Sequence, residues 1–516
     1  MNSLKPKLFT TIKGYSKGQL VKDITAGVIV AIIALPLSIA LALASGATPE
    51  QGLYTAIVAG FVISFLGGSR VQIAGPTAAF ASIVGGIIAV NGYSGLVIAT
   101  IMAGIMLVVM GFLKFGSLIK YIPFTITTGF TAGIAVTIAI GQVKDFLGLK
   151  FEKSPIETVE KVEEIASSIG TFNWQALVVG GVSLLILIFV PKVLKKIPPS
   201  IIAILVTALL VKFMNLDVLT IGDLYEISSK APTPHMPEFS LETAKAVLPD
   251  AVTIAVLAAV ESLLSCVVAD GMIGDKHNSN AELVAQGAGN ILSALFGGIP
   301  ATGAIARTAA NIKNGGRTPV AGMVHAVVLL AVLLVLMPLA SYIPMPTIAA
   351  ILFMVAYNMS EWREFVHICK TSPKSDVLVL VVTFVLTIAF DLVVAICVGI
   401  VLATVLFMKR MSDETKTEIV ESDSDDNTVV FAVKGSLFFG VADAFSDTVL
   451  SSDKERVIID MSAVAAIDAT GLHALERVAA AMKKAERSFT LVGLGSQPVK
   501  ALKKSGLYDE IVSENS

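Results

Sequence analysis

Fourteen apolar segments constrain this chain of 516 residues more than any other feature. A straight helix needs about 20 apolar residues to cross a bilayer, and several of the segments are shorter. A soluble chain of this length carries roughly a quarter charged residues, whereas this chain has 15%. We therefore predict a polytopic protein of the cell membrane, mostly α-helical. The segments lie at 24–44, 50–66, 76–91, 95–113, 123–143, 174–191, 198–214, 247–269, 281–296, 304–313, 318–339, 344–359, 375–390 and 391–408.

A short pattern occurs twice, at 66–78 and at 296–308. In each copy an apolar helix ends at a Gly-Gly pair. A few extended residues follow, and then a short segment rich in Gly, Ala and Thr. Bare backbone groups cost several kcal/mol in hydrocarbon unless protein buries them or they line a cavity. Two interrupted segments at matching places in two halves indicate the mid-membrane binding site of a transporter.

The repeat extends beyond this pattern. The Gly-Gly pairs at 67–68 and 297–298 are 230 residues apart, and the Tyr-Ile-Pro sequences at 121–123 and 342–344 are 221 apart. Each half therefore holds seven segments. An odd number per half forces the second half to enter the membrane upside down, which predicts a 7+7 inverted repeat.

Positive charges predict the orientation. Lys and Arg in short loops mark the cytoplasmic side, and most of them fall inside if the N-terminus is inside. The loops 144–172 and 215–246 then lie outside, and both termini are cytoplasmic. The cytoplasmic set includes Lys22, Arg70, Lys114, Lys120, Lys192, Lys195, Lys196, Lys276, Lys313, Arg317, Arg363, Lys370, Lys374, Lys409 and Arg410.

Changes in composition divide the chain into four parts. We interpret 1–22 as a retained cytoplasmic leader, because no cleavage-site pattern follows its lysines. The membrane domain is 23–410, an acidic linker is 411–427, and 428–516 is a small α/β domain. In that domain the pattern predicts strands at 429–433, 456–460 and 489–492, and helices at 471–484 and 498–506.

Several classes of protein are excluded by what the sequence lacks. A net charge of −2 gives no sign of nucleic-acid binding. The three cysteines show no metal spacing, and no phosphate-binding loop of the ATPase type occurs. No nucleophile and base are arranged for catalysis, so we expect no enzyme activity, no cofactor and no resident metal. His325 is interpreted as a packed core histidine.

Ordered motifs along the whole chain resemble the SulP family of anion transporters, the sulfate permeases. They are Leu35-Pro36, Gly52-Leu53-Tyr54, Gly75-Pro76, Ser279-Asn280, Glu282-Leu283, Gly287, Asn290 and Gly315-Gly316-Arg317-Thr318, and in the tail 457–462 and 467–472. The tail resembles a STAS domain. The resemblance implies fourteen segments split into a core (1–4 and 8–11) and a gate (5–7 and 12–14), a homodimer, and an elevator-like movement of core against gate.

The two interrupted segments predict an anion site. Their helices should begin near the bilayer midplane, where each N-terminus carries about half a positive charge and free N–H groups. Pro76 suits a first helical turn, and Thr77 and Thr302 can donate hydroxyl hydrogen bonds. The resemblance adds positions on the first segment. The full candidate set is Leu37, Ser38, Leu41, Pro76, Thr77, Ala78, Thr302, Gly303, Ala304, Ala306 and Arg307.

Arg307 and Glu261 are charges within apolar segments. A buried arginine costs at least about 2.5–3.5 kcal/mol, so Arg307 either strengthens anion binding or reaches the cytoplasmic surface from a helix end. The resemblance associates an acid at Glu261 with coupling to H⁺ or Na⁺. Ser265, one turn later, is a candidate ligand for Na⁺. A static Glu261–Arg307 pair is the structural alternative.

The expected function is secondary active transport of a small anion of the sulfate, bicarbonate or C4-dicarboxylate class, by symport with H⁺ or Na⁺. An uncoupled exchanger or anion channel of the same fold remains an alternative, as does a nucleobase permease. In the tail, Asp468 and Thr470 lie in a loop that could bind an anion or a cytoplasmic partner. The alternative is a dimer scaffold that braces the membrane domain.

Overall fold

The structure is a computed structural model that describes residues 4–12, 14–117, 123–153, 155, 157–194, 198–237, 240–390, 392–420 and 427–512, without the side chains of 392 and 393. Tyr121 and Ile122 of the first Tyr-Ile-Pro sequence, Lys120, Lys195 and Lys196, and 421–426 of the predicted linker lie outside the described residues. The chain forms two compact units, Met1–Ile400 and Val401–Ser516. Each is described by itself.

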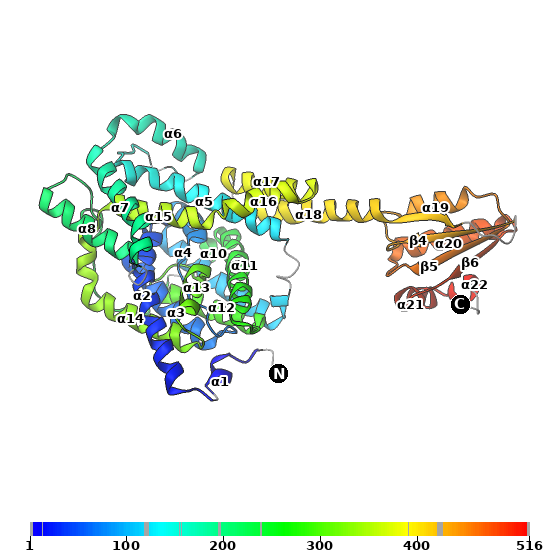
Figure 1. Ribbon diagram of the computed structural model, residues 1–516, viewed down its shortest axis with the longest axis horizontal. Helices are drawn as coiled ribbons and strands as arrows, with labels where there is room; N and C mark the ends of the chain where they lie inside the picture. The colour runs from blue at the N-terminus through cyan, green and yellow to red at the C-terminus, as the bar shows by residue number, and fades with distance from the viewer. Residues whose placement is uncertain are drawn as a thin grey trace. The chain divides into compact units, whose positions relative to one another are not determined.

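The membrane unit is helical, and every predicted apolar segment coincides with a helix or part of one (Figure 1). Eight described helices of the chain are long and apolar enough to cross a bilayer, and the count of fourteen crossings stays a prediction. In the first half the elements are α1 (Leu8–Thr11), α2 (Lys17–Ala44), α3 (Pro49–Leu66), β1 (Ala74–Gly75), α4 (Ala81–Phe112), α5 (Phe124–Leu147), α6 (Thr158–Ser168), α7 (Trp174–Val193) and α8 (Pro199–Met214).

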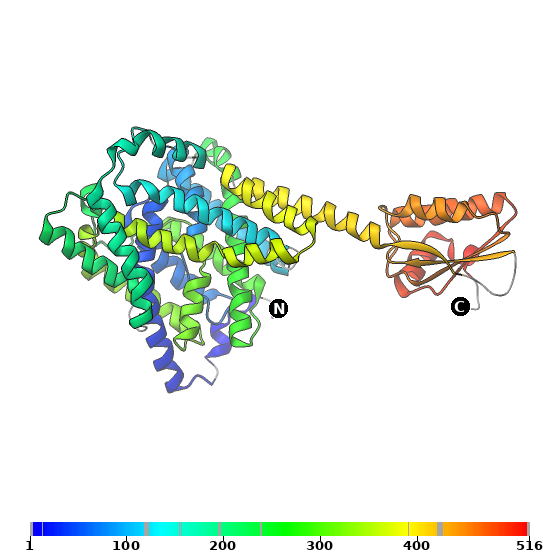
Figure 2. The ribbon, with the colours of Figure 1, turned by 45° about the horizontal axis from the view of Figure 1, so that its top comes forward.

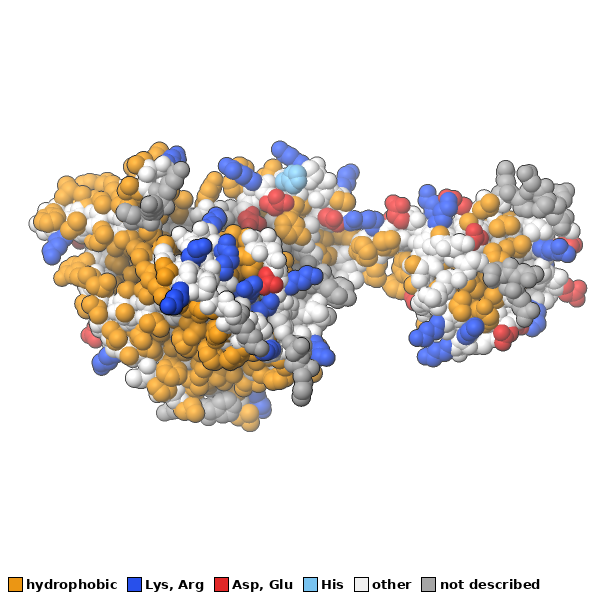
Figure 3. Space-filling model, turned by 60° about the horizontal axis from the view of Figure 1, so that its bottom comes forward, with side chains coloured by type: hydrophobic (Ala, Val, Ile, Leu, Met, Phe, Trp, Pro, Cys, Tyr) orange, Lys and Arg blue, Asp and Glu red, His pale blue; other side chains and the backbone are white. Residues whose placement is uncertain are grey.

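The second half repeats this order. Its elements are α9 (Ile221–Leu224), α10 (Leu241–Ala246), α11 (Leu248–Ile273), α12 (Ser279–Leu295), β2 (Thr302–Gly303), α13 (Ile305–Lys313), α14 (Val320–Leu336), α15 (Met345–Met359), α16 (Trp362–Thr371), α17 (Lys374–Ala389) and α18 (Leu392–Glu414). Hydrophobic side chains cover much of the face of this unit shown in Figure 3, with Lys and Arg side chains gathered near its middle.

Both interrupted segments are short helices. The third segment begins as a 3₁₀ turn at Ala78–Phe80, and Gly92, at φ 66° and ψ 179°, breaks α4 before the fourth segment. Only glycine adopts this backbone conformation without steric cost. The tenth segment is α13, which has nine residues. Neither helix is long enough to span a bilayer, because about 20 residues are needed.

The helices pack as a core and a gate. In the core, α12 lies against α3 and α4, while α14 lies against α2 and α3. In the gate, α5 contacts α15 and α17, and α7 contacts α8 and α15 (Figures 1 and 2). This division agrees with the one that the resemblance implied.

The second unit contains a four-stranded sheet in the order β3-β4-β5-β6 (Figure 1). The predicted strands and helices correspond to β4 (Thr428–Lys434), β5 (Arg456–Ala463), β6 (Ser488–Val492), α20 (Ala469–Lys484) and α21 (Ser496–Ser505). Three elements described in this unit were not predicted. They are α19 (Ala442–Leu450), α22 (Tyr508–Ile511) and β3 (Lys416–Val420). Strand β3 pairs antiparallel with β4 and lies within the range assigned to the linker.

Candidate functional site

The extended residues before the two short helices meet in the interior. Strands β1 and β2 are antiparallel, with Ala74 opposite Gly303 and Gly75 opposite Thr302, and all four residues are buried. Helical structure resumes at Ala78 on one side and at Ile305 on the other. The two helix N-termini therefore flank one strand pair, although 227 residues separate them in the sequence.

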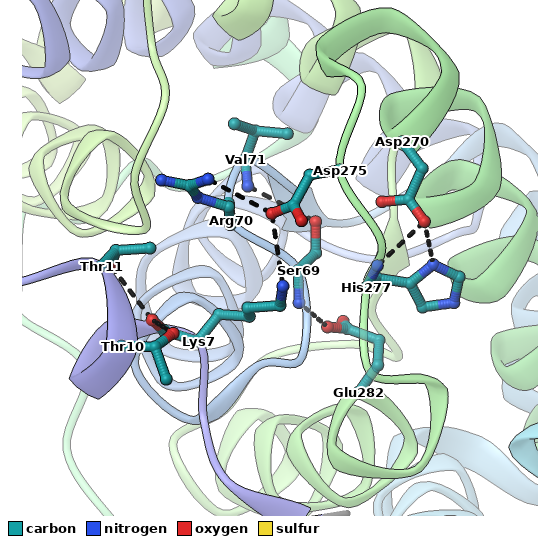
Figure 4. A network of polar contacts seen from close by, with 10 residues as sticks. All are labelled: Lys7, Thr10, Thr11, Ser69, Arg70, Val71, Asp270, Asp275, His277 and Glu282. Atoms are coloured by element: carbon teal, nitrogen blue, oxygen red, sulfur yellow. Dashed lines mark hydrogen bonds and ion pairs between the residues drawn. The ribbon is translucent and has the colours of Figure 1, made fainter.

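Buried polar side chains satisfy the backbone of the extended segments. The Glu282 carboxylate accepts hydrogen bonds from the N–H groups of Gly68 (2.9 Å) and Ser69 (3.1 Å), and Figure 4 shows the second. Asn290 bonds both the N–H and the carbonyl of Ala301, at 2.8 and 2.9 Å. Similar bonds come from Thr55, Ser262, Ser293, Thr308 and Asn311. These bonds make non-helical backbone tolerable at membrane depth.

A charged cluster joins the N-terminal segment to the loop between α11 and α12 (Figure 4). Asp275 forms ion pairs with Lys7 and Arg70, each at 3.3 Å. Partial burial opposes ionisation of Asp275, but the backbone N–H of Lys276 and the Lys7 ammonium outweigh it and lower its pKa below the ordinary value. Beside this cluster, His277 Nδ1 lies 2.7 Å from Asp270. The segment assigned as a leader is thus attached to the core.

A cavity of about 1150 Å³ lies between core and gate, and both short helices reach it. Its core lining includes Leu37, Leu41, Thr77, Ala78, Glu261, Ala304, Ala306 and Arg307. The lining also includes residues at helix ends, namely Leu194, Pro198, Asn314 and Glu361. These helix ends lie near the basic residues Lys192, Lys313 and Arg363 in the sequence. The cavity therefore extends toward the face that the positive charges predict to be cytoplasmic.

Arg307 lies in the first turn of α13 and is 4% exposed. Its Nη2 donates a hydrogen bond to the carbonyl of Pro76, at the start of the other short helix. Its Nη1 is buried and has no hydrogen-bond partner among the described residues. The side chain thus joins the two helix starts. One of the two sequence interpretations had the side chain reach the cytoplasmic surface, and it does not do so in this structure.

Glu261 lines the same cavity from α11. Its Oε2 accepts a hydrogen bond of 3.0 Å from the Thr77 hydroxyl. Among the described residues, no ion pair within 4 Å joins it to Arg307, so the static pair is not formed in this conformation. Two other carboxylates, of Asp23 and Glu282, are fully buried, but each accepts at least four hydrogen bonds.

Five predicted residues lie off the cavity lining. The Thr302 hydroxyl lies 2.6 Å from that of Ser262, and Ser265 donates to Thr308 at 3.4 Å. Both hydroxyls make contacts within the core in this conformation, and a role for them toward an anion or a cation stays a prediction. Ser38 is fully buried, while Gly303 lies in β2 and Pro76 offers its carbonyl to Arg307.

The gate lining was missed by the sequence analysis. Helix α5 presents Thr127, Thr128 and Thr131 to the cavity. The Thr128 hydroxyl is buried and unpartnered among the described residues. Three threonines on one face of an apolar segment are a signal that was available, since residues at i and i+4 share a helix face. Met354 and Asn358 of α15 complete this side.

In the tail, the predicted regulatory loop caps a helix. Asp468 is the N-cap of α20, and its carboxylate accepts from the N–H groups of Gly471 (2.7 Å) and Phe439 (3.0 Å). Such caps contribute about 1 kcal/mol. Thr470 is exposed in the first turn. Asp468 therefore caps α20, and a regulatory contact of this loop through Asp468 or Thr470 stays a prediction.

Two broken helices whose N-termini meet beside a cavity between two helical bodies are the arrangement typical of membrane transporters. The sequence pattern of the sulfate permease family matches residues 20–383, and that of the STAS domain matches 420–516. This chain therefore belongs to the sulfate permease family and carries a STAS domain.

Two relatives match almost the full length of the chain. "Putative sulfate transporter YvdB" of Bacillus subtilis (strain 168) is 42% identical over 97% of this chain and 96% of its own length. "Bicarbonate transporter BicA" of Picosynechococcus sp. is 32% identical over 95% of this chain and 91% of its own. Both are named as transporters and not as enzymes.

Solved structures show the same fold. The transmembrane domain of a cyanobacterial bicarbonate transporter BicA matches with a TM-score of 0.66 and 28% identity, over 76% of this chain and 98% of that one. Murine Slc26a9 in an inward-facing state matches with a TM-score of 0.88 and 19% identity, over 98% of this chain and 90% of that one.

Proposed function

We propose that this protein is a secondary active transporter of small oxyanions or carboxylates, of the sulfate, bicarbonate or C4-dicarboxylate class. The observation that carries the proposal is the position of Arg307, which lines the cavity and bridges the two helix N-termini there. The names of YvdB and BicA support the sulfate and bicarbonate classes.

The anion is held by fixed positive potential. Each helix N-terminus contributes about half an elementary charge and free N–H groups, and Arg307 adds a full charge with a planar set of donors suited to oxyanions. The helix starts at Ala78 and Ile305 border the cavity. An anion placed between them gains these interactions, with the threonines of α5 on the opposite side of the cavity.

Glu261 is the proposed coupling group. It is a carboxylate within a membrane helix that borders the cavity, and among the described residues it accepts one hydrogen bond, from Thr77. Its remaining lone pairs are free to take a proton or to contribute to a Na⁺ site that forms with the substrate. Because Thr77 belongs to the same helix start that faces the anion, loading of the cation and loading of the anion act on one structural element.

Transport then requires movement of the core against the gate. The cavity is bounded by both bodies and extends toward the predicted cytoplasmic face, so this conformation is proposed to be inward-facing. We propose a homodimer in the cell membrane with cytoplasmic termini. The tail is proposed to contact the partner copy or a cytoplasmic protein, with the exposed Thr470 as one contact.

The test is uptake into proteoliposomes of labelled sulfate, bicarbonate and fumarate, each measured with imposed pH or Na⁺ gradients. We expect Arg307→Gln to weaken anion binding roughly 10- to 100-fold, the loss of one charge-assisted hydrogen bond or more. Glu261→Gln should retain binding and make uptake insensitive to the gradients. Arg70→Gln, a charge removed outside the cavity, is the matched control and should bind like the wild type.

Three outcomes contradict parts of the proposal. Unchanged affinity in Arg307→Gln places the anion elsewhere. Wild-type flux that ignores both gradients selects an uncoupled exchanger or channel. Competition by uracil without competition by any anion selects a nucleobase permease.

A further inference from the structure

The loop between α8 and α11 links the gate to the core on the side that the charges predict to be outside the cell. We call residues 216–235 of this loop the outer strap. Its first end is hydrogen-bonded to the gate, and its second end is hydrogen-bonded to the core. The two bodies that the proposed transport cycle moves are thus joined by a short piece of chain.

Backbone hydrogen bonds fix the first end of the outer strap to the gate. The N–H of Ile221 donates to the carbonyl of Ile343, and the carbonyl of Leu219 accepts from the N–H of Met345, each at 2.9 Å. These two bonds enclose an antiparallel bridge between the strap and the start of α15. The first end is therefore fixed to a gate helix.

Three hydrogen bonds fix the second end to the core, at the outer ends of α3 and α12. The Glu50 carboxylate, which is 6% exposed, accepts from the N–H of Ser228 at 2.6 Å. The Tyr54 hydroxyl donates to the carbonyl of Lys230 at 3.0 Å. The N–H of His235 donates to the carbonyl of the last residue of α12 at 2.9 Å. The bond to Glu50 is the strongest type of the three, because its acceptor is charged.

Little chain is available between the two ends. Six residues separate Ile221 from Ser228, and the first three of them belong to the one-turn helix α9. Tyr225 is already extended, with φ −137° and ψ 136°. A helix rises 1.5 Å per residue and a strand about 3.3 Å, so complete unwinding of α9 adds only about 7 Å of reach. A larger displacement of core against gate along the strap must break the bonds at one end.

We propose that the outer strap is a latch that holds the core in this conformation and releases it when the core moves against the gate. The inference rests on the movement included in the proposed function. The core end is the one that opens, because two of its three bonds come from side chains, whereas the bonds from Leu219 and Ile221 join backbone to backbone. The bonds to Glu50 and Tyr54 therefore favour the conformation whose cavity extends toward the predicted cytoplasmic face.

Cross-links at the two ends of the outer strap test this latch in the full-length protein in proteoliposomes. The two exposed native cysteines are first replaced by serine. Glu50→Cys with Ser228→Cys, bridged by a short thiol reagent that a reductant removes, joins the strap to the core. We expect this bridge to stop uptake of sulfate and bicarbonate, and the reductant to restore it.

The matched control joins the strap to the gate. A Cβ at Gly222 would lie 2.8 Å from the Cβ of Ser341, so Gly222→Cys with Ser341→Cys places the same bridge at the first end. This bridge should leave uptake unchanged, because its two residues move together. Uptake that continues through the core bridge overturns the latch, and so does arrest by the gate bridge.

Trypsin detects the release without a cysteine substitution. Lys230 is exposed, but its carbonyl, at the point of cleavage, accepts the bond from Tyr54. We expect cleavage after Lys230 from the outer side to be faster while the protein transports an anion than in its absence. Tyr54→Phe should be cut faster than the wild type without anion, and cleavage after Lys150 on the other outer loop should not change.

Equal cleavage after Lys230 with and without transport overturns the latch. Failure of the proposed function gives a different result, because the wild-type protein would then take up neither sulfate nor bicarbonate before any bridge is formed. Uptake measured in each cysteine variant before bridging and after reduction shows that the variant is folded.

Discussion

At the scale of single residues, Gly75 decides where the Arg307 guanidinium can lie. Gly75 has φ 156°, and a Cβ there would lie 2.5 Å from Arg307 Nη1. Gly75→Ala should therefore displace the arginine and weaken sulfate or bicarbonate binding by about tenfold, comparable with the loss of one good hydrogen bond. Binding isotherms on purified protein measure this.

Gly85→Ala is the matched control, because a Cβ at that position meets no atom closer than 3.7 Å. It lies on the short helix that follows Gly75, and this variant should bind like the wild type. Equal losses in both variants would show that the helix is generally intolerant of substitution, and would contradict a specific contact between Gly75 and Arg307.

The charged residues of the cavity were predictable from sequence, but their neighbours were not. Arg307 and Glu261 stand out because a charge in an apolar segment is costly and needs a reason. Thr302 and Ser265 were placed at the site from sequence spacing alone. Whether a hydroxyl faces a cavity or a neighbouring helix depends on packing between segments distant in the chain, which spacing does not encode.

At the scale of elements, Glu282 is the residue that holds the first extended segment. Its carboxylate accepts from two backbone N–H groups and from the amides of Gln72 and Gln286. Glu282→Ala leaves these donors unpaired in the interior, at roughly 1–3 kcal/mol each. We expect a markedly lower unfolding midpoint in detergent and loss of transport. Thermal unfolding followed by tryptophan fluorescence measures the first effect.

Glu163→Ala provides the control, since that carboxylate is exposed on α6. It should unfold at the temperature of the wild type. A Glu282→Ala variant that is as stable as the control would contradict the assignment of these hydrogen bonds to the stability of the core.

Elements were predictable where apolar length or glycine gave a signal. The Gly-Gly pairs and the short apolar runs predicted both broken helices, and the strand–helix alternation predicted most of the tail. Strand β3 was missed because its residues Lys416–Val420 are mostly exposed and mix polar with apolar side chains. Its place is set by pairing with β4, which a local pattern does not reveal.

At the scale of the whole molecule, β3 determines where the tail can be removed. A chain that ends at residue 427 keeps β3 but loses β4, so five residues with exposed Ile419 and Val420 would lack their pairing strand. Unpaired strand edges promote aggregation. We expect 1–427 to aggregate, whereas 1–414 should remain monodisperse and transport more slowly with unchanged preference among anions. Size-exclusion chromatography and competitive uptake measure these properties.

Altered anion preference in 1–414 would contradict this expectation, because it would place selectivity in the tail. Equal dispersity of the two truncated chains would show that the β3 edge has no consequence for association.

The hydrogen bonds of the first extended segment also bear on how the protein is made. Backbone groups at 68–73 find their partners in side chains 213 to 240 residues later, on Glu282, Thr308 and Asn311. A ribosome that adds about 5–20 residues per second needs roughly 10–50 s to supply them. During that interval the nascent first half must keep this stretch in a hydrated or chaperoned environment. Its release into lipid has to wait for the second half of the polypeptide.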